Sequence, residues 1–329
     1  MQKIKLAILG YGNVGRGVEY AIHQKDDMEL EAIFTHRKPD QITTVTDGVK
    51  VYSIKDAEKF LDSIDVMLLC GGSASDLPEQ GPHFAAMFNC VDSFDTHAKI
   101  PEYFAAIDEN AKKSKKTSVI SAGWDPGLFS LLRVLGKAYI PKGDEYTFWG
   151  KGVSQGHSEA INRIDGVKFA IQYSIPIENA VNEVRKGNNP TLTARQKQIR
   201  ECFVVAEPQV DLKTIEHSIK TMPHYFSDYN TIVHFITEEE FVASHSKMPH
   251  GGLVFRTGTS GRENMHKQRM EFLLQLECNP EFTANIMVAY ARAAYRLFKM
   301  NDFGAKTVLD IPVGLIVPES MEELRKTVL

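Results

Sequence analysis

The sequence has few of the features that mark a disulfide-rich or metal-binding protein. It contains four cysteines in 329 residues, Cys70, Cys90, Cys202 and Cys278, and no CxxC pair. Such scattered cysteines are typical of reduced, buried thiols and favour a cytoplasmic protein over a secreted one. The eleven histidines form no HExxH pattern and no Cys/His cluster, so no metal site is predicted.

Long apolar runs and an excess of positive charge are also lacking. No apolar stretch approaches the length that spans a bilayer, so no membrane segment is expected. The N-terminal MQKIKLAILG ends in Gly-Tyr-Gly without a cleavage site, which indicates a first strand rather than a signal peptide. The net charge of −4 gives no reason to expect a nucleic-acid partner.

The composition that remains is that of an ordinary globular protein, with 43% hydrophobic and 24% charged residues. The first part of the chain alternates apolar strands with helical stretches. The predicted strands are Ile4–Leu9, Leu30–Phe34, Val66–Cys70, Cys90–Phe94 and Ser118–Ser121, with helices such as 13–23 and 101–113 between them. This order predicts a parallel sheet covered on both faces.

Beyond Ala138 the predicted strands show more apolar–polar alternation. They are Tyr146–Trp149, Val167–Ser174, Cys202–Ala206, Ile232–Ile236, Leu253–Thr257 and Gln268–Leu276, with helices such as 212–220 interspersed. The fold class is therefore α/β: a Rossmann-type doubly wound parallel sheet at 1–122, followed by an α+β domain with a mostly antiparallel sheet at 123–279. The long helix expected at 282–300 belongs to a C-terminal segment, about 280–329, that should pack back on the first domain.

A glycine-rich turn follows the first strand. Gly10-Tyr11-Gly12-Asn13-Val14-Gly15 fits GxGxxG, and it opens a helix within a βαβ unit, which is the context that this pattern requires. The glycines allow a tight turn and a close approach to a pyrophosphate at the helix N-terminus. We therefore predict a dinucleotide site at this turn.

The second strand indicates which dinucleotide is bound. It ends in Thr35-His36-Arg37-Lys38, with a hydroxyl and positive charges but no acid to bind a ribose 2′-OH. This favours NADP, whose 2′-phosphate suits such a tip. After the third strand, Cys70-Gly71-Gly72-Ser73-Ala74 leaves room for the nicotinamide half, and Asp92, Ser93 and Phe94 at the end of the fourth strand complete the predicted cofactor edge.

Two acids stand where ligands bind in such folds, at the carboxyl ends of the strands. Asp95 follows the fourth strand in VDSFD, and Asp125 follows the fifth in GWDPG. Two carboxylates there would attract a cationic amine. Asp125 before Pro126 is also a typical helix N-cap, and one carboxylate can both cap a helix and bind an amine.

At these residues the sequence resembles the meso-diaminopimelate dehydrogenases. The resemblance runs over essentially the whole chain and rests on GYGNVG, FTHR, CGGSASDLPEQ, VDSFDTH, GWDPG, TFWGKGVSQGHS, RECFVVA, MPHGG and NPEFTA. It implies a homodimeric, NADP-dependent enzyme whose second domain binds substrate and forms the dimer. The implied reaction is reversible oxidative deamination of the D-centre of meso-2,6-diaminopimelate to L-2-amino-6-oxopimelate and ammonia. That product cyclises to tetrahydrodipicolinate, a precursor of lysine and peptidoglycan.

The resemblance also implies residue roles. Asp95, Trp124, Asp125, Trp149, Gln155 and Gly156 should surround the D-centre, with Asp95 and Asp125 catalytic, and Ser174, Arg200, His250 and Asn279 should hold the distal L-centre. Ser174 departs from the family, where a Thr is expected, and keeps only the hydroxyl. Either catalytic carboxylate, or a water that it holds, could act as the base. The alternatives are a dihydrodipicolinate- or homoserine-type NADP reductase and a non-catalytic NADP-binding sensor.

Overall fold

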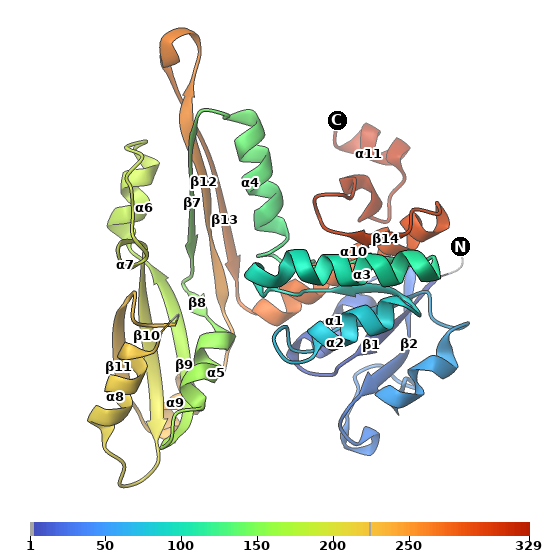
Figure 1. Ribbon diagram of the computed structural model, residues 1–329, viewed down its shortest axis with the longest axis horizontal. Coiled ribbons are helices and arrows are strands. Elements are labelled where there is room, and N and C mark those ends of the chain that lie inside the picture. The colour runs from blue at the N-terminus through green and yellow to red at the C-terminus, as the bar shows by residue number, and fades with distance from the viewer. Residues whose placement is uncertain (1–2, 224) are drawn as a thin grey trace. The chain divides into compact units, whose positions relative to one another are not determined.

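The computed structural model describes residues 3–223 and 225–329. It divides into two compact units (Figure 1). The first comprises the chain up to Leu131 together with Pro280–Leu329, and the second is Leu132–Asn279. The first unit therefore extends beyond residue 122, where the sequence placed the boundary, and it includes the C-terminal segment.

The first unit is built on a parallel seven-stranded sheet. Its strands are β1 (Ile4–Leu9), β2 (Met28–Thr35), β3 (Lys50–Ser53), β4 (Val66–Leu69), β5 (Asn89–Asp92), β6 (Thr117–Val119) and β14 (Gly304–Lys306). They lie in the order β14-β6-β5-β4-β1-β2-β3, and every pairing is parallel. The chain winds outward in both directions from β1 and β4, so the topological switch point lies between these two strands.

Helices cover both faces of this sheet, because the apolar side chains of each strand alternate between them. Leu6 and Ile8 of β1 pack in a core with α1 (Asn13–His23) and α10 (Asn279–Lys299). Ala7 and Leu9 pack in a second core with α2 (Leu77–Ala85) and α3 (Ile100–Ser114). The predicted doubly wound α/β architecture is confirmed.

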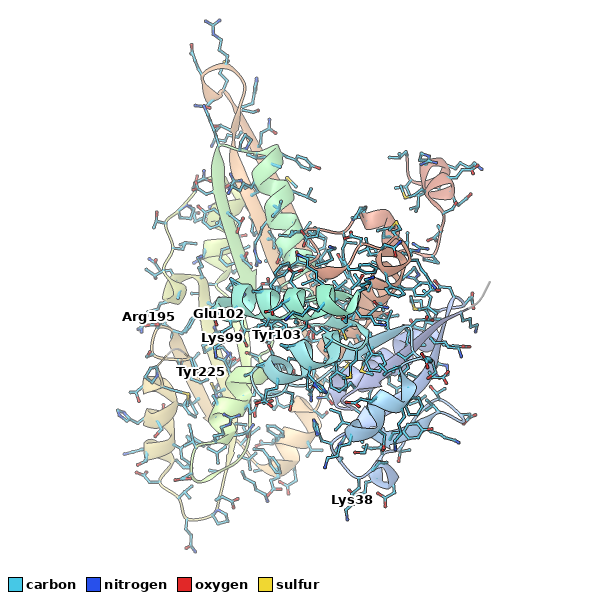
Figure 2. The ribbon with its side chains drawn as sticks, turned by 45° about the vertical axis from the view of Figure 1, so that its right-hand side comes forward. Lys38, Lys99, Glu102, Tyr103, Arg195 and Tyr225 are labelled. Atoms are coloured by element: carbon cyan, nitrogen blue, oxygen red, sulfur yellow. The ribbon has the colours of Figure 1, made fainter. Side chains whose placement is uncertain are left out.

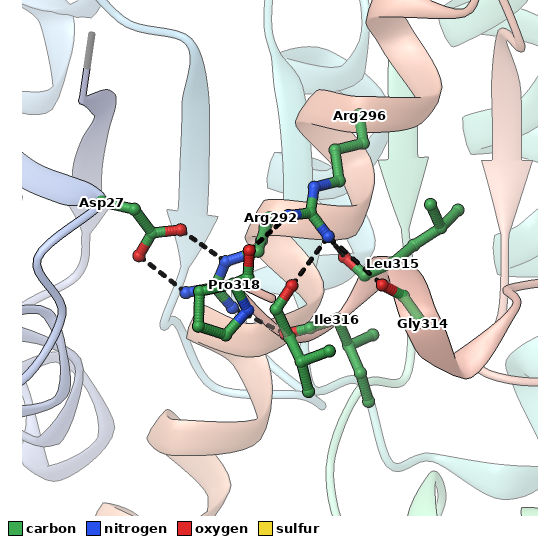
Figure 3. A network of polar contacts seen from close by, with 8 residues as sticks. Asp27, Arg292, Arg296, Gly314, Leu315, Ile316 and Pro318 are labelled. Atoms are coloured by element: carbon green, nitrogen blue, oxygen red, sulfur yellow. Dashed lines mark hydrogen bonds and ion pairs between the residues drawn. The ribbon is translucent and has the colours of Figure 1, made fainter. Parts of the chain in front are cut away.

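Two arginines of α10 fix the C-terminal segment within the first unit (Figure 3). Arg292 is only 2% exposed and binds both carboxylate oxygens of Asp27 at 2.6 and 2.8 Å and the carbonyl of Ile316 at 2.6 Å. Arg296 donates to a run of main-chain carbonyls, those of Gly314, Leu315, Val317 and Pro318. The segment that ends in α11 (Met321–Thr327) is thus attached by main-chain contacts as well as apolar packing.

The second unit contains two smaller sheets. One has the order β11 (Asn230–Phe235), β10 (Gln198–Ala206), β9 (Val167–Pro176), β8 (Gly152–Val153), and the other β13 (His266–Leu276), β12 (His250–Ser260), β7 (Gly143–Trp149). All pairings are antiparallel except β10 with β11, which confirms the predicted mostly antiparallel sheet with one departure. The helices are α4 (Leu128–Tyr139), which begins in the first unit, α5 (Gln155–Asn162), α6 (Glu178–Arg185), α7 (Ala194–Lys197), α8 (Leu212–Thr221) and α9 (Glu238–His245).

Several local elements were not predicted. Gln155 and Gly156 lie in the first turn of α5, which follows Ser154. Short 3₁₀ helices occur at Pro39–Gln41, Ile54–Phe60, His97–Lys99, Arg262–Asn264 and Val313–Leu315. Within residues 3–223 and 225–329, no helix combines the length and the apolar character that crossing a membrane requires.

Candidate active site

The glycine-rich turn after β1 has the backbone that a pyrophosphate cradle needs. Gly10 has φ +95°, a left-handed conformation that favours glycine, and its N–H donates to Phe34 O of β2 at 2.8 Å. A Cβ on Gly15 would lie 2.2 Å from Gly10 O, so only glycine fits there. A Cβ on Gly12 would meet no atom within 4 Å, which leaves space above the N-terminus of α1. The turn therefore fits the diphosphate of a dinucleotide.

The tip of β2 places positive charge beside this turn. The Arg37 guanidinium donates to the main-chain carbonyl of Tyr11, while the Arg37 N–H donates to the Thr35 hydroxyl at 3.1 Å. His36, Arg37 and Lys38 are exposed, and Figure 2 marks Lys38 at the surface of the first unit. Thr35 is 3% exposed, so its hydroxyl shapes the tip from inside. The two exposed cations fit the 2′-phosphate that distinguishes NADP from NAD.

Two buried side chains, those of Tyr11 and Glu19, connect the glycine-rich turn to α1. Glu19 of α1 is fully buried and accepts a hydrogen bond from the Tyr11 hydroxyl and from the main-chain N–H groups of Val45 and Thr46. Burial raises the pKa of Glu19, but these hydrogen bonds outweigh it and hold the pKa below its ordinary value. Glu19 was not predicted to contribute. It links the turn to the segment that leads from β2 to β3.

The segment after β4 lies against the glycine-rich turn. A Cβ on Gly10 would stand 3.2 Å from the main-chain carbon of Cys70 and from the nitrogen of Gly71. The Gly72 N–H donates to Asp76 at 2.7 Å, and the Ser73 hydroxyl accepts from the Asp95 N–H at 2.8 Å. The predicted cofactor segments 10–15 and 70–74 therefore share one edge of the sheet, and Ser73 also joins that edge to Asp95.

The side chain of Asp92 is enclosed at the end of β5. Asp92 is 1% exposed, and its carboxylate accepts hydrogen bonds from Phe94, Tyr103 and Ser121. Phe94 is also 1% exposed, and its ring stacks on Tyr103 of α3 with centroids 4.0 Å apart. Ser93 is half-buried. The end of β5 is therefore more enclosed than the sequence suggested.

Asp95, Trp124 and Asp125 lie just beyond the ends of β5 and β6. Asp95 is exposed and Asp125 is half-buried, while Trp124 is 8% exposed and meets Phe129 edge to face at 5.2 Å. The prediction that Asp125 caps the next helix is wrong, because α4 begins at Leu128. Main-chain bonds close the intervening turn instead, from Gly123 N to Pro126 O and from Leu128 N to Gly123 O.

In the second unit, Arg200 and Ser174 are direct partners in the pairing of β10 with β9. The Arg200 guanidinium donates to the Ser174 hydroxyl and lies over the ring of Tyr229, 4.1 Å from its centroid. Arg200 is 6% exposed, and its Nε has no hydrogen-bond partner in the described part of the chain. The described residues also offer this guanidinium no carboxylate within ion-pair distance. A bound carboxylate would give this buried guanidinium both a hydrogen-bond acceptor and a counter-charge.

Two further polar residues of this region were given no role from the sequence. Gln172 lies two residues before Ser174 on the same face of β9, is fully buried, and neither of its amide atoms has a partner among the described residues. His157 of α5 accepts or donates a bond with Ser154 at 2.7 Å. Burial and the nearby charge of Arg200 lower the pKa of His157 to about 4, so it is neutral at pH 7. These two residues are identified as candidate site residues only by their burial in the folded structure.

The remaining predicted substrate residues of the second unit gather around the segment before β12. Gln155 reaches the sulfur of Met248 at 3.3 Å, and the Asn279 N–H donates to Met248 O at 2.9 Å. His250 opens β12 and accepts the Gly251 N–H at 2.7 Å, and a Cβ on Gly152 would lie 2.3 Å from His250 Cα.

Two more predicted residues extend this cluster. Gly156 is exposed next to Gln155 in the first turn of α5. Trp149 pairs with Gly252 of β12, and its carbonyl accepts from the Gln198 side chain at 2.6 Å. The structure therefore brings Trp149, Gln155, Gly156, His250 and Asn279 together within one unit.

Comparisons with known proteins give the family. Residues 123–278 match the family described as diaminopimelic acid dehydrogenase C-terminal domain, and residues 1–76 match a CoA binding domain. The meso-diaminopimelate D-dehydrogenase of Lysinibacillus sphaericus is 60% identical over 329 residues, all of both chains. A crystal structure of the Corynebacterium glutamicum DAP dehydrogenase in complex with DAP is 42% identical and covers both chains fully, with a TM-score of 0.93. An engineered D-amino acid dehydrogenase bound to NADP+ is 40% identical, also over both full chains, with a TM-score of 0.88. This chain belongs to the meso-diaminopimelate D-dehydrogenase family.

Proposed function

We propose that the chain oxidises the D-centre of meso-2,6-diaminopimelate with Asp95 and Asp125 as its reacting carboxylates. The reaction is NADP-dependent and reversible, and it yields L-2-amino-6-oxopimelate, which cyclises to tetrahydrodipicolinate, and ammonia. The match to the dehydrogenase family over the whole chain supports this activity rather than a reductase or a sensor. The observation that carries the residue assignment is the position of both carboxylates at neighbouring strand ends, beyond β5 and β6.

The two carboxylates would act on the substrate amine. That amine is a cation in water, and the pair Asp95 and Asp125 would bind it and help it to lose a proton. NADP, when bound, accepts the hydride from the D-carbon. Positive charge then develops on the substrate as an iminium, and fixed carboxylates stabilise it. Water adds to this group and ammonia leaves. The buried ring of Trp124 would exclude bulk water from the amine.

Arg200 would hold the other end of the substrate. Its guanidinium is buried, already oriented by Ser174 and Tyr229, and without a carboxylate partner among the described residues. A distal carboxylate would supply that partner and form a bidentate pair. We assign His250 and Asn279 to the same L-centre, and Trp149, Gln155 and Gly156 to the D-centre. In this assignment the first unit would supply the reacting carboxylates, and the second unit would recognise both centres of the substrate.

We further infer a homodimer in the cytoplasm. The second unit carries exposed apolar side chains on α4 and β13, among them Val134, Tyr139 and Leu273, which a second copy could cover. All four cysteines are free, as expected of a chain in a reducing compartment. Sedimentation of the purified protein would test the dimer.

The activity is tested by following NADPH absorbance. The protein is mixed with NADP and meso-diaminopimelate, with the LL-isomer, D-lysine and NAD as controls. Turnover with the meso compound and NADP alone is the expected result. No turnover with any substrate, in protein that binds NADPH, would contradict the assignment.

A further inference from the structure

The side chain of Asp92 connects the two strand ends that carry the proposed reacting carboxylates. It is the last residue of β5, three residues before Asp95. One carboxylate oxygen, Oδ1, accepts the N–H of Phe94 at 2.9 Å and the N–H of Ser121 at 3.0 Å. Phe94 directly precedes Asp95, and Ser121 follows β6 four residues before Asp125. A single oxygen atom therefore ties both loops.

The remaining atoms of Asp92 reinforce this connection. Its second carboxylate oxygen accepts the hydroxyl of Tyr103 at 2.8 Å, and its main-chain carbonyl accepts the N–H of Ala122 at 2.8 Å. Tyr103 lies on α3, where Figure 2 labels it. Asp92 is thus bound by Tyr103 of a helix, while it binds the main chain of two loops.

Ser121 shows why such a connection is needed. It is a non-glycine residue with φ 56°, a left-handed backbone conformation that costs free energy and persists only where its surroundings hold it. Its N–H bonds to Asp92, and the next N–H bonds to the Asp92 carbonyl. The chain is therefore fixed in a sharp turn just before Trp124 and Asp125.

Burying the carboxylate of Asp92 to make these hydrogen bonds costs free energy. It is 1% exposed, and burial raises its pKa to about 6, although the three hydrogen bonds lower it. A buried carboxylate stays ionised only where hydrogen-bond donors surround it, and three donors surround that of Asp92. An apolar side chain could fill the same volume, but it would not present one oxygen to two N–H groups.

From this geometry we propose that Asp92 is a positioning residue for the reaction: it sets the spacing between Asp95 and Asp125 by tying their loops to one carboxylate. In this role it acts through the two loops and not by contact with substrate or cofactor. The proposal rests on the proposed roles of Asp95 and Asp125. Ser73, which accepts the Asp95 N–H, fixes the outer side of the same loop.

The test compares Asp92→Ala with Asp92→Asn. Alanine removes every side-chain bond and frees both loops. Asparagine keeps Oδ1 for the two N–H groups, and its amide can donate to the Tyr103 oxygen. Misplacement of a reacting group by about 1 Å can cost 10²-fold in rate. We therefore expect D92A to lose about 10²-fold in kcat with an unchanged NADPH dissociation constant, and D92N to recover most of that loss.

The primary kinetic isotope effect separates positioning from a merely structural role. With substrate deuterated at the D-carbon, D92A should show a larger isotope effect on kcat than the parent, because hydride transfer becomes slower than the other steps. The matched control is Asp108→Asn. Asp108 also accepts a main-chain N–H in the first unit, that of Ala305 of β14 at 3.0 Å, and neither residue belongs to the two loops that Asp92 ties. It should lose stability and keep the parent isotope effect.

The outcomes are distinguishable. No turnover by the parent enzyme would contradict the proposed function itself. A folded D92A with parent kcat and isotope effect would overturn the positioning role alone, and so would a D92N as impaired as D92A. If D92A does not fold, Tyr103→Phe takes its place, since it loosens the Asp92 carboxylate without removing it. An unchanged isotope effect in that variant would also overturn the proposal.

Discussion

Three buried charged groups, Glu19 and Asp92 of the first unit and Arg200 of the second, differ in how far the chain itself supplies their hydrogen-bond partners. In the first unit, the carboxylates of Glu19 and Asp92 accept three hydrogen bonds each from the chain itself. In the second unit, the buried guanidinium of Arg200 has a donor without a partner in the described residues, and so does the amide of Gln172 two residues from Ser174. Among the described residues of the first unit, the buried side-chain atoms without partners belong to neutral groups, Gln80, Ser118 and Ser121.

This difference suggests a division of labour. A group whose bonds are all made within the chain is already in its working position and can hold others there. A buried cation with an unmet donor is costly until an anion arrives, so it favours the ligand that supplies one. The first unit would then be organised for the chemical step and the second for recognition. Four predictions test this comparison.

The largest effect should come from the reacting carboxylates. Asp125→Asn keeps the shape of the side chain and removes its charge, so the developing iminium loses a stabilising partner. We expect kcat to fall by roughly 10²–10³-fold, as for loss of one group that stabilises transition-state charge, while NADPH still binds. Steady-state kinetics and fluorescence titration of NADPH would measure both. Near-normal turnover in the folded variant would remove Asp125 from the mechanism.

Arg200 should show the complementary pattern. Arg200→Lys keeps a positive charge but loses the planar bidentate geometry, so kcat/KM for meso-diaminopimelate should fall by about 10²-fold. D-amino acids without a distal carboxylate should be affected much less.

The matched control is Arg195→Ala, at an exposed arginine of the same unit that Figure 2 labels and that donates to Ser227 O at 3.0 Å. It should behave as the parent. Equal losses for dicarboxylate and monocarboxylate substrates in R200K would show that the second unit does not carry recognition.

Arg37 tests the cofactor end of the first unit. Arg37→Ala removes a charged donor that fits the 2′-phosphate, so the NADP dissociation constant should rise by about 10–100-fold. The NAD dissociation constant should change little, because NAD has no phosphate there. Calorimetric titration with both nucleotides measures the difference, with R195A as the charge-matched control. An equal weakening for NADP and NAD would contradict the phosphate contact.

Much of this architecture could be predicted because it rests on local patterns. The apolar runs that form β1 and β4, and the glycines that follow β1, fix the parallel sheet and its ligand edge. Strands β3 and β14 were missed because they are short and owe their place to pairing with β2 and β6. The start of α4 was misplaced because main-chain bonds of residues 123–129 override the usual preference of Asp-Pro for a helix start.

The candidate site was predictable in position more than in detail. A strand end indicates that Asp92 and Asp95 lie at the ligand edge, but not that one side chain is 1% exposed while the other is exposed. The same holds for Gln172, whose polar end is enclosed only once β9 packs under α5. Directions of side chains and the burial of polar atoms come from tertiary packing, and no spacing in the sequence encodes them directly.

The smallest effect on activity, with a clear effect on stability, is expected at the Asp27–Arg292 pair. Asp27→Asn leaves Arg292, which is 2% exposed, without its counter-charge (Figure 3). Breaking a fully buried pair costs about 3–5 kcal/mol, and the partial exposure of Asp27 reduces the expected loss to roughly 2–3 kcal/mol. The kcat at low temperature should stay at the parent value, because the pair lies away from the ligand edge. A changed kcat would mean that the chemical step depends on the Asp27–Arg292 pair as well as on the residues at the strand ends.

The pH dependence gives this prediction its sign. The hydrogen bonds and charge of Arg292 lower the pKa of Asp27 below its ordinary value of 3.8. The unfolded chain therefore binds a proton at a higher pH than the folded chain, so the stabilisation is present above about pH 5 and is lost as pH falls through the folded pKa. Urea unfolding should separate parent and D27N at pH 7 and bring them together in acid. The exposed pair Glu322–Lys326 of α11 supplies the control, since Glu322→Gln should shift the midpoint little at either pH. A gap between parent and D27N that persists in acid would mean that Asp27 acts through packing rather than through its charge.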